Sequence, residues 1–333
     1  MAKNKNREQV LEDNLLEFPE VPTLTLAKKI YKEYPELFTN LESLRSALRY
    51  RRGNNGNTNR ANAKNKHGDS FRKNGEAGFK VELPKSIADP HKNFNLPDGK
   101  AFIMSDVHIP YHDDKALEAA LAYADYYEPD YFVFNGDIAD FYSISRWEKN
   151  PAERNLSREL QLCRQFLQHM RERYPKCRMI YKIGNHEERW EKYMWLKAPE
   201  LSGVSEFEIY DILNFSKYGV EEVKGKQKIK AGNHLTIIHG HEMFNSTAPV
   251  NFARTLQTNL GVCAIAGHRH QTSEHAFKNA DNKHIHCWSL GCLCDMSPEY
   301  AVINRWNHGF ATMELNGNNF NVTNKRIIDG VVY

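Results

Sequence analysis

The feature that most constrains the fold is a pattern that occurs five times between residues 101 and 270. Each time, a short apolar run rich in branched or aromatic residues ends at a cluster of side chains that can bind metal ions. The runs cover residues 101–105, 131–135, 178–183, 235–238 and 262–266. Runs of this length and composition predict buried strands. Because α/β sheets build their sites from polar residues at the carboxyl ends of strands, we predict an α/β domain with one composite site.

The clusters after these runs provide seven candidate metal ligands. They comprise two carboxylates, one amide oxygen and four imidazoles, with no thiolate: Asp106, His108, Asp137, Asn185, His239, His268 and His270. Ligands of these types suit borderline divalent ions such as manganese, iron or zinc. Seven ligands are too many for one four-coordinate ion that keeps an open position. They therefore predict two divalent ions that share a bridging ligand.

The last cluster places two imidazoles two residues apart, at His268 and His270. In an extended chain this separation spans roughly 6.6 Å and leaves both side chains on one side. Metal–nitrogen bonds of about 2.0–2.1 Å then let each ring bind a different member of a pair of ions about 3.5–4 Å apart.

Taken in order, the five clusters resemble those of the calcineurin-like metallophosphoesterase superfamily. The match covers about residues 101–291, with further strands expected to Tyr333. The resemblance implies a two-sheet sandwich flanked by helices. It also implies that one ion is held by Asp106, His108, Asp137 and His270. The other ion would be held by Asp137, Asn185, His239 and His268, with Asp137 as the bridge.

Catalytic and substrate-binding roles follow for residues in or beside the ligands. The resemblance implies that His186 lies over the leaving group, as a general acid or a phosphate contact. The ligand chemistry leads to the same reaction, because paired divalent ions lower the pKa of a bridging water and generate a hydroxide for in-line attack on phosphorus. Substrate contacts are predicted for Asn185, His241 and Arg269. For the last two, the alternative is a position behind the ligands or on the surface.

The net charge of +3 conceals an uneven distribution. Residues 45–73 contain nine Lys or Arg against one acid, Asp69, so the rest of the chain is net negative. A cationic segment beside a mildly acidic body predicts contact with a polyanion at one end of the chain. The alternative is a solvated tail.

A small helical module is predicted before the cationic segment. Residues 25–34 have apolar side chains at helical spacing, and Thr39-Asn-Leu-Glu42 predicts a capping box that starts a second helix. Arg45, Arg49 and Arg52 lie along one edge of this second helix. Two short helices with an arginine edge resemble a helix-turn-helix whose second helix binds DNA. The alternative is a helical hairpin packed on the main domain, with its arginines solvated.

These patterns divide the chain into an N-terminal tail (1–22), a helix-turn-helix-like basic module (23–53), a flexible linker (54–95) and a metallophosphoesterase domain (96–333). Residues 53–68 contain six asparagines and almost no apolar side chain, so burial cannot offset their ordering entropy. No apolar run reaches the ~18 residues of a membrane helix, and the first residues lack a secretion signal. We therefore expect no membrane contact and a cytoplasmic protein, such as a bacterial or viral enzyme in its host.

Three functions fit the sequence. The first is a phosphodiesterase or nuclease that acts on DNA with two divalent ions, of which manganese is the first choice. The second is a phosphomonoesterase acting on a phosphoprotein or a small phosphate, with the N-terminal module as a docking device. The third is a nucleic-acid-binding protein with a silent metal site. The sequence predicts no oligomeric state.

Overall fold

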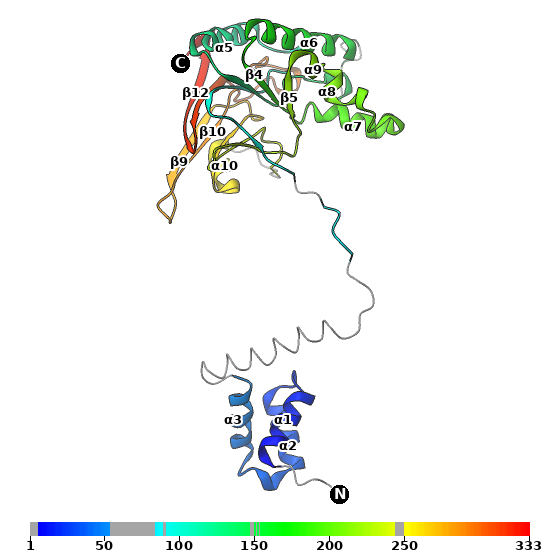
Figure 1. Cartoon of the computed structure of the whole chain (residues 1–333), viewed down its shortest axis with the longest axis vertical. Helices are drawn as coiled ribbons and strands as arrows, with labels where there is room; N and C mark the ends of the chain where they lie inside the picture. The colour runs from blue at the N-terminus through cyan, green and yellow to red at the C-terminus, as the bar shows by residue number, and fades with distance from the viewer. Residues whose placement is uncertain are drawn as a thin grey trace. The chain divides into compact units, whose positions relative to one another are not determined.

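A computed structural model describes residues 6–53, 84–88, 91–146, 150, 152, 154–243 and 250–333. The chain forms two compact units, Met1–Ala88 and Asp89–Tyr333, and each is described by itself. The described residues 6–53 of the first unit are mainly helical, and the second unit contains two sheets with helices around them (Figure 1). None of the described helices combines the length and the apolarity that crossing a membrane requires.

One sheet of the second unit has seven strands in the order β13-β12-β11-β2-β3-β4-β5. In chain order these strands are β2 (Gly99–Met104), β3 (Tyr131–Asn135), β4 (Arg178–Lys182), β5 (Val220–Val223), β11 (His308–Asn316), β12 (Asn319–Ile328) and β13 (Val331–Val332). Strands β2 to β5 are parallel, whereas β11 pairs antiparallel with β2. The carboxyl ends of β2, β3 and β4 therefore meet at one edge.

The other sheet has six strands in the order β1-β6-β7-β8-β10-β9. Its strands are β1 (Phe94–Asn95), β6 (Ile229–Ala231), β7 (Leu235–Ile238), β8 (Cys263–Ala266), β9 (Ser273–Lys278) and β10 (His284–Ser289). Strands β7, β8 and β10 run parallel, so β7 and β8 also end at the same edge.

The helices of this unit lie outside the sheets. The longer ones are α5 (Asp114–Tyr127), α6 (Leu156–Arg173), α7 (Glu188–Lys197) and α10 (Phe252–Leu260). Short turns of helix are η2 (Tyr142–Ile144), η4 (Pro199–Leu201), η5 (Ser205–Phe207), α8 (Ile209–Ile212), α9 (Phe215–Tyr218) and η6 (Glu299–Ala301). Helices α5 and α6 run along one face of the seven-stranded sheet in Figure 1, and α10 packs on β8, β9 and β10.

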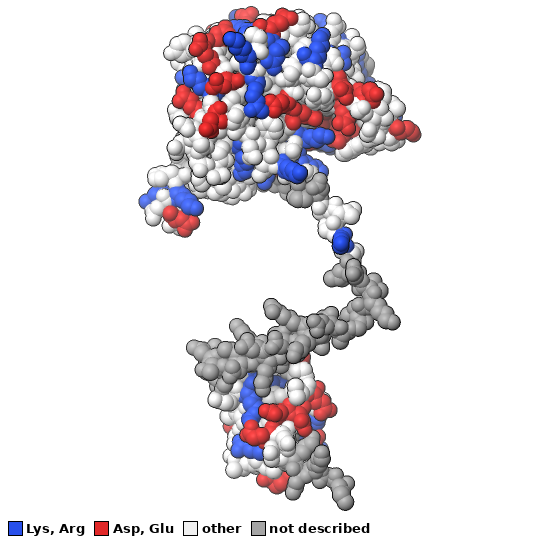
Figure 2. Space-filling model, viewed as in Figure 1, with Lys and Arg blue, Asp and Glu red and all other residues white. Residues whose placement is uncertain are grey.

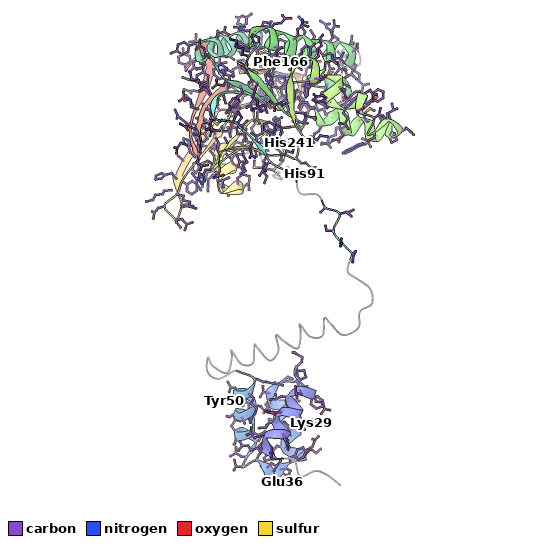
Figure 3. All side chains as sticks on the ribbon, in the orientation of Figure 1. Lys29, Glu36, Tyr50, His91, Phe166 and His241 are labelled. Carbon is purple, nitrogen blue, oxygen red and sulfur yellow. The ribbon has the colours of Figure 1, made fainter. Side chains whose placement is uncertain are left out.

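Strand alternation divides the apolar side chains between two cores. Phe102 and Phe134 belong to the core beneath the helices, where Phe134 packs on Phe166 of α6 at a ring distance of 5.8 Å (Figure 3). Ala101 and Val133, one residue away on the same strands, belong to the core between the sheets. The two-sheet sandwich flanked by helices that the sequence predicted is therefore confirmed.

Residues 6–53 of the first unit form three α-helices around a small apolar core. They are α1 (Arg7–Glu17), α2 (Thr23–Glu33) and α3 (Leu41–Arg51), with a short turn η1 (Pro35–Leu37) before α3. Their apolar faces meet at Val10, Leu11, Leu26, Ala27, Ile30, Phe38, Leu44 and Leu48. The described residues 6–53 carry eight basic and eight acidic side chains, and both signs are visible on this unit in Figure 2.

Three details differ from the sequence analysis. The segment 1–22 is not simply a tail, because Asn6 and Gln9 form a capping box that starts α1, and Val10 and Leu11 are buried. The cap of α3 is Asn40, whose side chain accepts from the Ser43 backbone at 2.8 Å, and not the preceding threonine. Of the predicted linker 54–95, residues 54–83 lie outside the described residues, and β1 within it pairs with β6.

Candidate metal centre

The seven candidate ligands lie on loops that follow strands of both sheets. The loop after β2 holds two of them, the loops after β3, β4 and β7 hold one each, and the loop after β8 holds the last two. In the order of these loops they are Asp106, His108, Asp137, Asn185, His239, His268 and His270. The carboxyl ends of parallel strands in the two sheets thus supply one site.

One group of ligands forms around Asp106. Its Oδ1 atom lies 3.1 Å from Nε2 of His270 and 3.9 Å from Nε2 of His108. The two imidazoles also face each other, with their Nε2 atoms 3.2 Å apart. Asp106 is completely buried, and its Oδ1 has no hydrogen-bond partner. A buried carboxylate oxygen without a donor, facing two ring nitrogens, fits a bound cation.

A second group forms around Asp137 and His239. Oδ2 of Asp137 lies 3.1 Å from Nε2 of His239, which is 3.2 Å from Oδ1 of Asn185. Ligand atoms of Asp137, His239 and His268 all lie within 4.8 Å of one another. The two groups adjoin, because Nε2 of His239 lies 4.0 Å from Oδ1 of Asp106. The residues present therefore fit two neighbouring divalent ions.

The ring nitrogens that face away from the groups also have partners. Nδ1 of His108 lies 2.8 Å from Oδ2 of Asp140, and Nδ1 of His239 lies 2.7 Å from the Asn135 carbonyl. Such contacts orient an imidazole and fix which nitrogen faces the metal. The carboxylate of Asp140 therefore orients the ring of His108.

The backbone of the centre has an unusual conformation. Five of the seven ligands have positive φ angles between 53° and 68°: Asp106, His108, Asp137, His268 and His270. This region of φ is disfavoured for residues with a side chain and persists only when the surroundings enforce it.

Glu187 helps to hold this backbone conformation, and no role was predicted for it from the sequence. Its buried carboxylate accepts bonds of 2.9–3.0 Å from four backbone amides and one of 2.6 Å from a phenol. The donors are Asp137, Ile138, Ala139, Gly184 and the Tyr181 hydroxyl. The loops after β3 and β4 are thereby joined. A Cβ at Gly184 would lie 2.2 Å from Oδ1 of Asp137, so this approach requires glycine.

Charges in the centre compensate one another. Burial acts to raise the pKa of Asp106, but His270 and His239 outweigh it and hold the pKa below its usual value. Burial acts to lower the pKa of His239, but Asp137 and Asp106 outweigh it and raise the pKa to about 10. The carboxylates thus favour protonation of His239 and His270, whereas burial and the neighbouring histidines lower the pKa values of His108 and His268. Bound cations would displace those protons.

His186 lies beside the two groups, and ligand atoms of His186, His108 and Asp137 all lie within 4.8 Å of one another. Its Nδ1 lies 2.9 Å from the Asp140 carbonyl, and its Nε2 lies 3.8 Å from Oδ2 of Asp137. Arg189, which the sequence analysis did not identify, places Nη2 2.8 Å from Nε2 of His186 and donates from Nη1 to the Asp140 carbonyl at 2.9 Å. No sequence signal distinguishes this arginine, because its partners become neighbours only in the fold.

His241 and Arg269, the other predicted substrate contacts, differ in whether their polar atoms already have partners in the structure. Nε2 of His241 lies 3.0 Å from Oε1 of Glu188, so a neighbouring carboxylate already binds this ring. Arg269 lies over the ring of Phe252 at 5.5 Å, and its buried Nε has no hydrogen-bond partner. Arg269 therefore keeps donor capacity for a ligand.

The arginines predicted to contact DNA also differ in how far their side chains are used in contacts within the helical unit. Arg45 pairs with Glu42 at 3.4 Å, Arg49 is exposed, and Arg52 is partly buried. Arg52 donates to the carbonyls of Val21 and Phe18 at 2.7 and 3.1 Å, and so it ties the end of α3 to the α1–α2 connection.

The chain is similar in sequence to a known protein family and to two phage proteins. The family model described as calcineurin-like phosphoesterase matches residues 99–276. The chain is 30% identical over 229 residues to the Gene 54 protein of Mycobacterium phage L5, covering 65% of this chain and 88% of that one. It is 27% identical over 230 residues to the Gene 54 protein of Mycobacterium phage D29, covering 65% and 89%.

Solved structures also align with the chain. Vacuolar Protein Sorting 29 from Cryptosporidium parvum is 13% identical, with a TM-score of 0.40, and the alignment covers 71% of this chain and 96% of that one. Yfce, a phosphoesterase from E. coli, is 13% identical, with a TM-score of 0.31, and the alignment covers 67% and 98%.

Proposed function

The chain belongs to the calcineurin-like phosphoesterase family and is a metal-dependent phosphoester hydrolase, and from this premise we propose that its substrate is a phosphodiester of DNA. The observation that carries the hydrolytic part is the pair of adjoining ligand groups with the unpartnered Oδ1 of Asp106. The observation that favours DNA is the excess of basic residues over 45–73, near one end of the chain.

The ligand sets proposed for the two ions overlap at one residue. The first set is Asp106, His108, Asp137 and His270, and the second is Asp137, Asn185, His239 and His268. Asp137 is the proposed bridge. When bound, the ions supply Lewis acidity and activate a water for attack on phosphorus. Manganese is the first choice of metal, and iron and zinc also suit this set of oxygen and imidazole ligands.

His186 is the proposed general acid. Burial acts to lower the pKa of His186, but Asp137 and Asp140 outweigh that effect and raise it, which favours the protonated ring that a general acid needs. Asp140 orients the ring through Nδ1, which leaves Nε2 for the departing oxygen. Arg189 donates toward this same Nε2 in the structure, because a guanidinium cannot accept, so the departing oxygen must displace Arg189 before it can take a proton from His186. Arg269, Asn185 and His241 are the further proposed substrate contacts.

The N-terminal part is proposed to bind DNA as a helix-turn-helix-like module (23–53) with a basic linker (54–95) before the catalytic domain (96–333). Because residues 6–53 are charge-balanced, the attraction is proposed to come chiefly from the basic residues after position 53. Arg45 and Arg49 are the proposed contacts on α3. Arg52 is a weaker candidate, because its donors are used within the unit.

That charge balance also favours a second candidate. A phosphomonoesterase acting on a phosphoprotein or small phosphate would use the helical unit for docking and would need no basic face on it. In either case the proposed location is the host cytoplasm, because the relatives are phage proteins and no described helix fits a membrane span.

Hydrolysis assays separate these candidates. Purified protein with manganese is offered single-stranded and double-stranded DNA, bis-p-nitrophenyl phosphate and p-nitrophenyl phosphate. Cleavage of DNA and of the diester supports the proposal, whereas cleavage confined to the monoester contradicts it. No turnover with both metals bound would favour the silent binding module.

A variant pair tests the acid. His186→Ala is expected to lower kcat about 100- to 1,000-fold while the metal content stays unchanged. His169→Ala is the matched control, because His169 is exposed on α6, and it should leave kcat unchanged. Equal kcat for both variants would exclude His186 as the acid.

A further inference from the structure

We infer that four aromatic side chains beside the centre, Tyr111, Tyr142, Tyr300 and Trp306, bind the nucleobase adjoining the hydrolysed phosphate. We call this set the aromatic rim. The inference rests on the proposed function and narrows it, because it identifies the substrate as a nucleotide ester and not as a phosphoester in general.

One pair of the rim adjoins a predicted metal ligand directly. The ring of Trp306 lies 4.1 Å from the ring of His270, at an interplanar angle of 62°. Tyr300 lies 6.2 Å from Trp306, at 61°. The two rings therefore extend outward from the ligand group around Asp106, along the loop that leads from β10 to β11.

The other pair lies on the neighbouring loops. Tyr111 and Tyr142 are 5.5 Å apart, at 65°. Tyr111 follows the ligand His108 by three residues, and its carbonyl accepts from the Asp295 amide at 2.8 Å. This bond joins the loop after β2 to the loop that holds Tyr300. Both pairs thus border the same side of the centre.

The rim is accessible in spite of its apolar character. Tyr300 is 73% exposed and Tyr111 is 37% exposed, and the adjacent Val302 and Ile303 are 65% and 96% exposed. Large apolar side chains grouped beside a charged centre mark a binding surface more often than an ordinary part of the protein surface. Because the aromatic rim adjoins the candidate metal centre, a substrate bound at the centre would lie against the rim.

A nucleobase fits the rim better than a charged group does. Aromatic side chains stack on any base, because every base presents a flat π face. The loop with Tyr300 carries one cation, Arg305, against Asp295 and Glu299, so charge gives it no preference for phosphate. The ligand groups and Arg269 would hold the phosphate, and the rim would hold the base next to it.

Two diesters with the same leaving group isolate the contribution of the base. They are thymidine 5′-(p-nitrophenyl phosphate) and methyl p-nitrophenyl phosphate, offered to the full chain with manganese. We expect kcat/KM to favour the thymidine ester at least about tenfold, as stacking on one aromatic side chain provides. Tyr300→Leu should remove most of this preference without changing kcat/KM for the methyl ester.

Two further variants serve as controls. Tyr300→Phe keeps the ring and should keep the preference. Ile303→Ser changes a 96% exposed residue of the same loop and should keep it as well. A structural defect in the loop would instead lower kcat/KM for both esters in parallel, and that result for Tyr300→Leu would overturn the inference.

The remaining outcomes separate this inference from the proposed function. Equal hydrolysis of both esters by the unaltered protein overturns the aromatic rim and leaves the phosphodiesterase intact. Hydrolysis of neither ester, with two metal ions bound, contradicts the phosphodiesterase and the rim together. An oligomer that Ile303→Ser and Tyr300→Leu both dissociate, with no change in ester preference, would assign the exposed loop to a second copy of the chain.

Discussion

The two units bury different kinds of side chain. In the described part of the helical unit, the buried set is apolar except for Asn14. The described part of the phosphoesterase unit buries sixteen polar or charged side chains, and most of those that carry charge surround the metal centre. Burying charge costs free energy unless each group is paired. The helical unit is therefore organised for stability, whereas the phosphoesterase unit gives up stability for chemistry at one edge of its sheets.

The backbones differ in parallel with the side chains. Among the residues described in 6–53, no non-glycine residue has a positive φ angle, whereas five metal-ligand candidates do. Each such residue costs about 1–3 kcal/mol and is retained where the surroundings enforce it. Conformational strain and buried charge thus coincide in the phosphoesterase unit and are both absent from the described helical residues.

The largest effect is expected from a substitution of Asp137, the residue proposed to bridge the two ions. Asp137→Asn replaces the proposed bridge with a neutral group, so kcat/KM for a phosphodiester should fall at least about 1,000-fold, or about 4 kcal/mol. Elemental analysis should show the loss of one or both metal ions per chain. Unfolding of the helical unit should not change.

Asp125→Asn is the matched control for this substitution. The Asp125 carboxylate pairs with Arg173 and accepts from the Tyr174 hydroxyl, away from the centre. The control should keep full activity and metal content. An Asp137→Asn protein that is fully active would contradict the bridging role.

A smaller effect is expected from breaking the ion pair between Lys182 and Glu242, which contacts the backbone of His239. Nζ of Lys182 lies 2.9 Å from Glu242, whose carboxylate accepts from the His239 and Gly240 amides at 3.1 and 2.7 Å. Burial acts to raise the pKa of Glu242, but Lys182 and the nearby His241 outweigh it and lower the pKa to about 2. The depressed pKa means that the carboxylate stabilises the fold above pH 4.5, and this stability is lost as the pH falls toward about 2.

Glu242→Gln tests this pair. The free energy of unfolding of the metal-free protein should fall by about 3 kcal/mol at pH 7, and its dependence on pH between 4.5 and 2 should flatten. Urea titrations at several pH values measure both. Glu221→Gln, which breaks an exposed pair with Arg178, should cost less than about 1 kcal/mol. An unchanged pH profile in Glu242→Gln would refute the assignment.

Metal addition distinguishes the units directly. Manganese at about 100 times its dissociation constant should stabilise the phosphoesterase unit by about 2.7 kcal/mol for each bound ion and leave the helical unit unchanged. Thermal unfolding with manganese or with a chelator measures the difference. Leu48→Ala, in the core of the helical unit, identifies the transition that metal should not move. A metal-dependent shift of that transition would show that the units are coupled.

The same contrast explains what the sequence could predict. The strand ends were predictable because buried runs such as 131–135 match β3 residue for residue, and each run leads directly to its ligand. The fold followed from the order of these runs. Within the helical unit, α1 was missed although Asn6 and Gln9 form a recognisable capping box, because only a short apolar stretch follows them.

Other parts of the site depend on contacts between distant residues. Glu187 acts on amides that precede it by about fifty positions, and Arg189 contacts the loop that holds Asp140. The positive φ angles at Asp106 and Asp137 also depend on their surroundings, because such angles are uncommon even for Asp, which adopts them more often than most residues. Spacing along the chain does not reveal such partners, so the sequence could place the candidate ligands after the strand ends but could not identify the residues that position them.

The smallest effect separates two neighbouring arginines of α3 that look alike in the sequence. Arg49 is exposed, so Arg49→Ala should leave the unfolding free energy within about 0.5 kcal/mol. It should weaken DNA binding two- to threefold. It should also reduce the slope of the logarithm of the binding constant against the logarithm of the salt concentration by about one, as loss of one phosphate contact does. Arg52 bonds Val21, Thr23 and Phe18, so Arg52→Ala should instead destabilise the helical unit by about 1–2 kcal/mol.

Measuring both quantities for both variants makes this comparison decisive. Denaturant unfolding gives the stability, and fluorescence anisotropy of labelled DNA across salt concentrations gives the number of phosphate contacts. If Arg49→Ala leaves the salt dependence unchanged, α3 does not contact DNA, and the basic residues after position 53 would have to account for all binding. If Arg52→Ala alters the salt dependence without loss of stability, its bonds within the unit must yield to DNA, and the helical unit would then be a ligand-responsive part of the molecule.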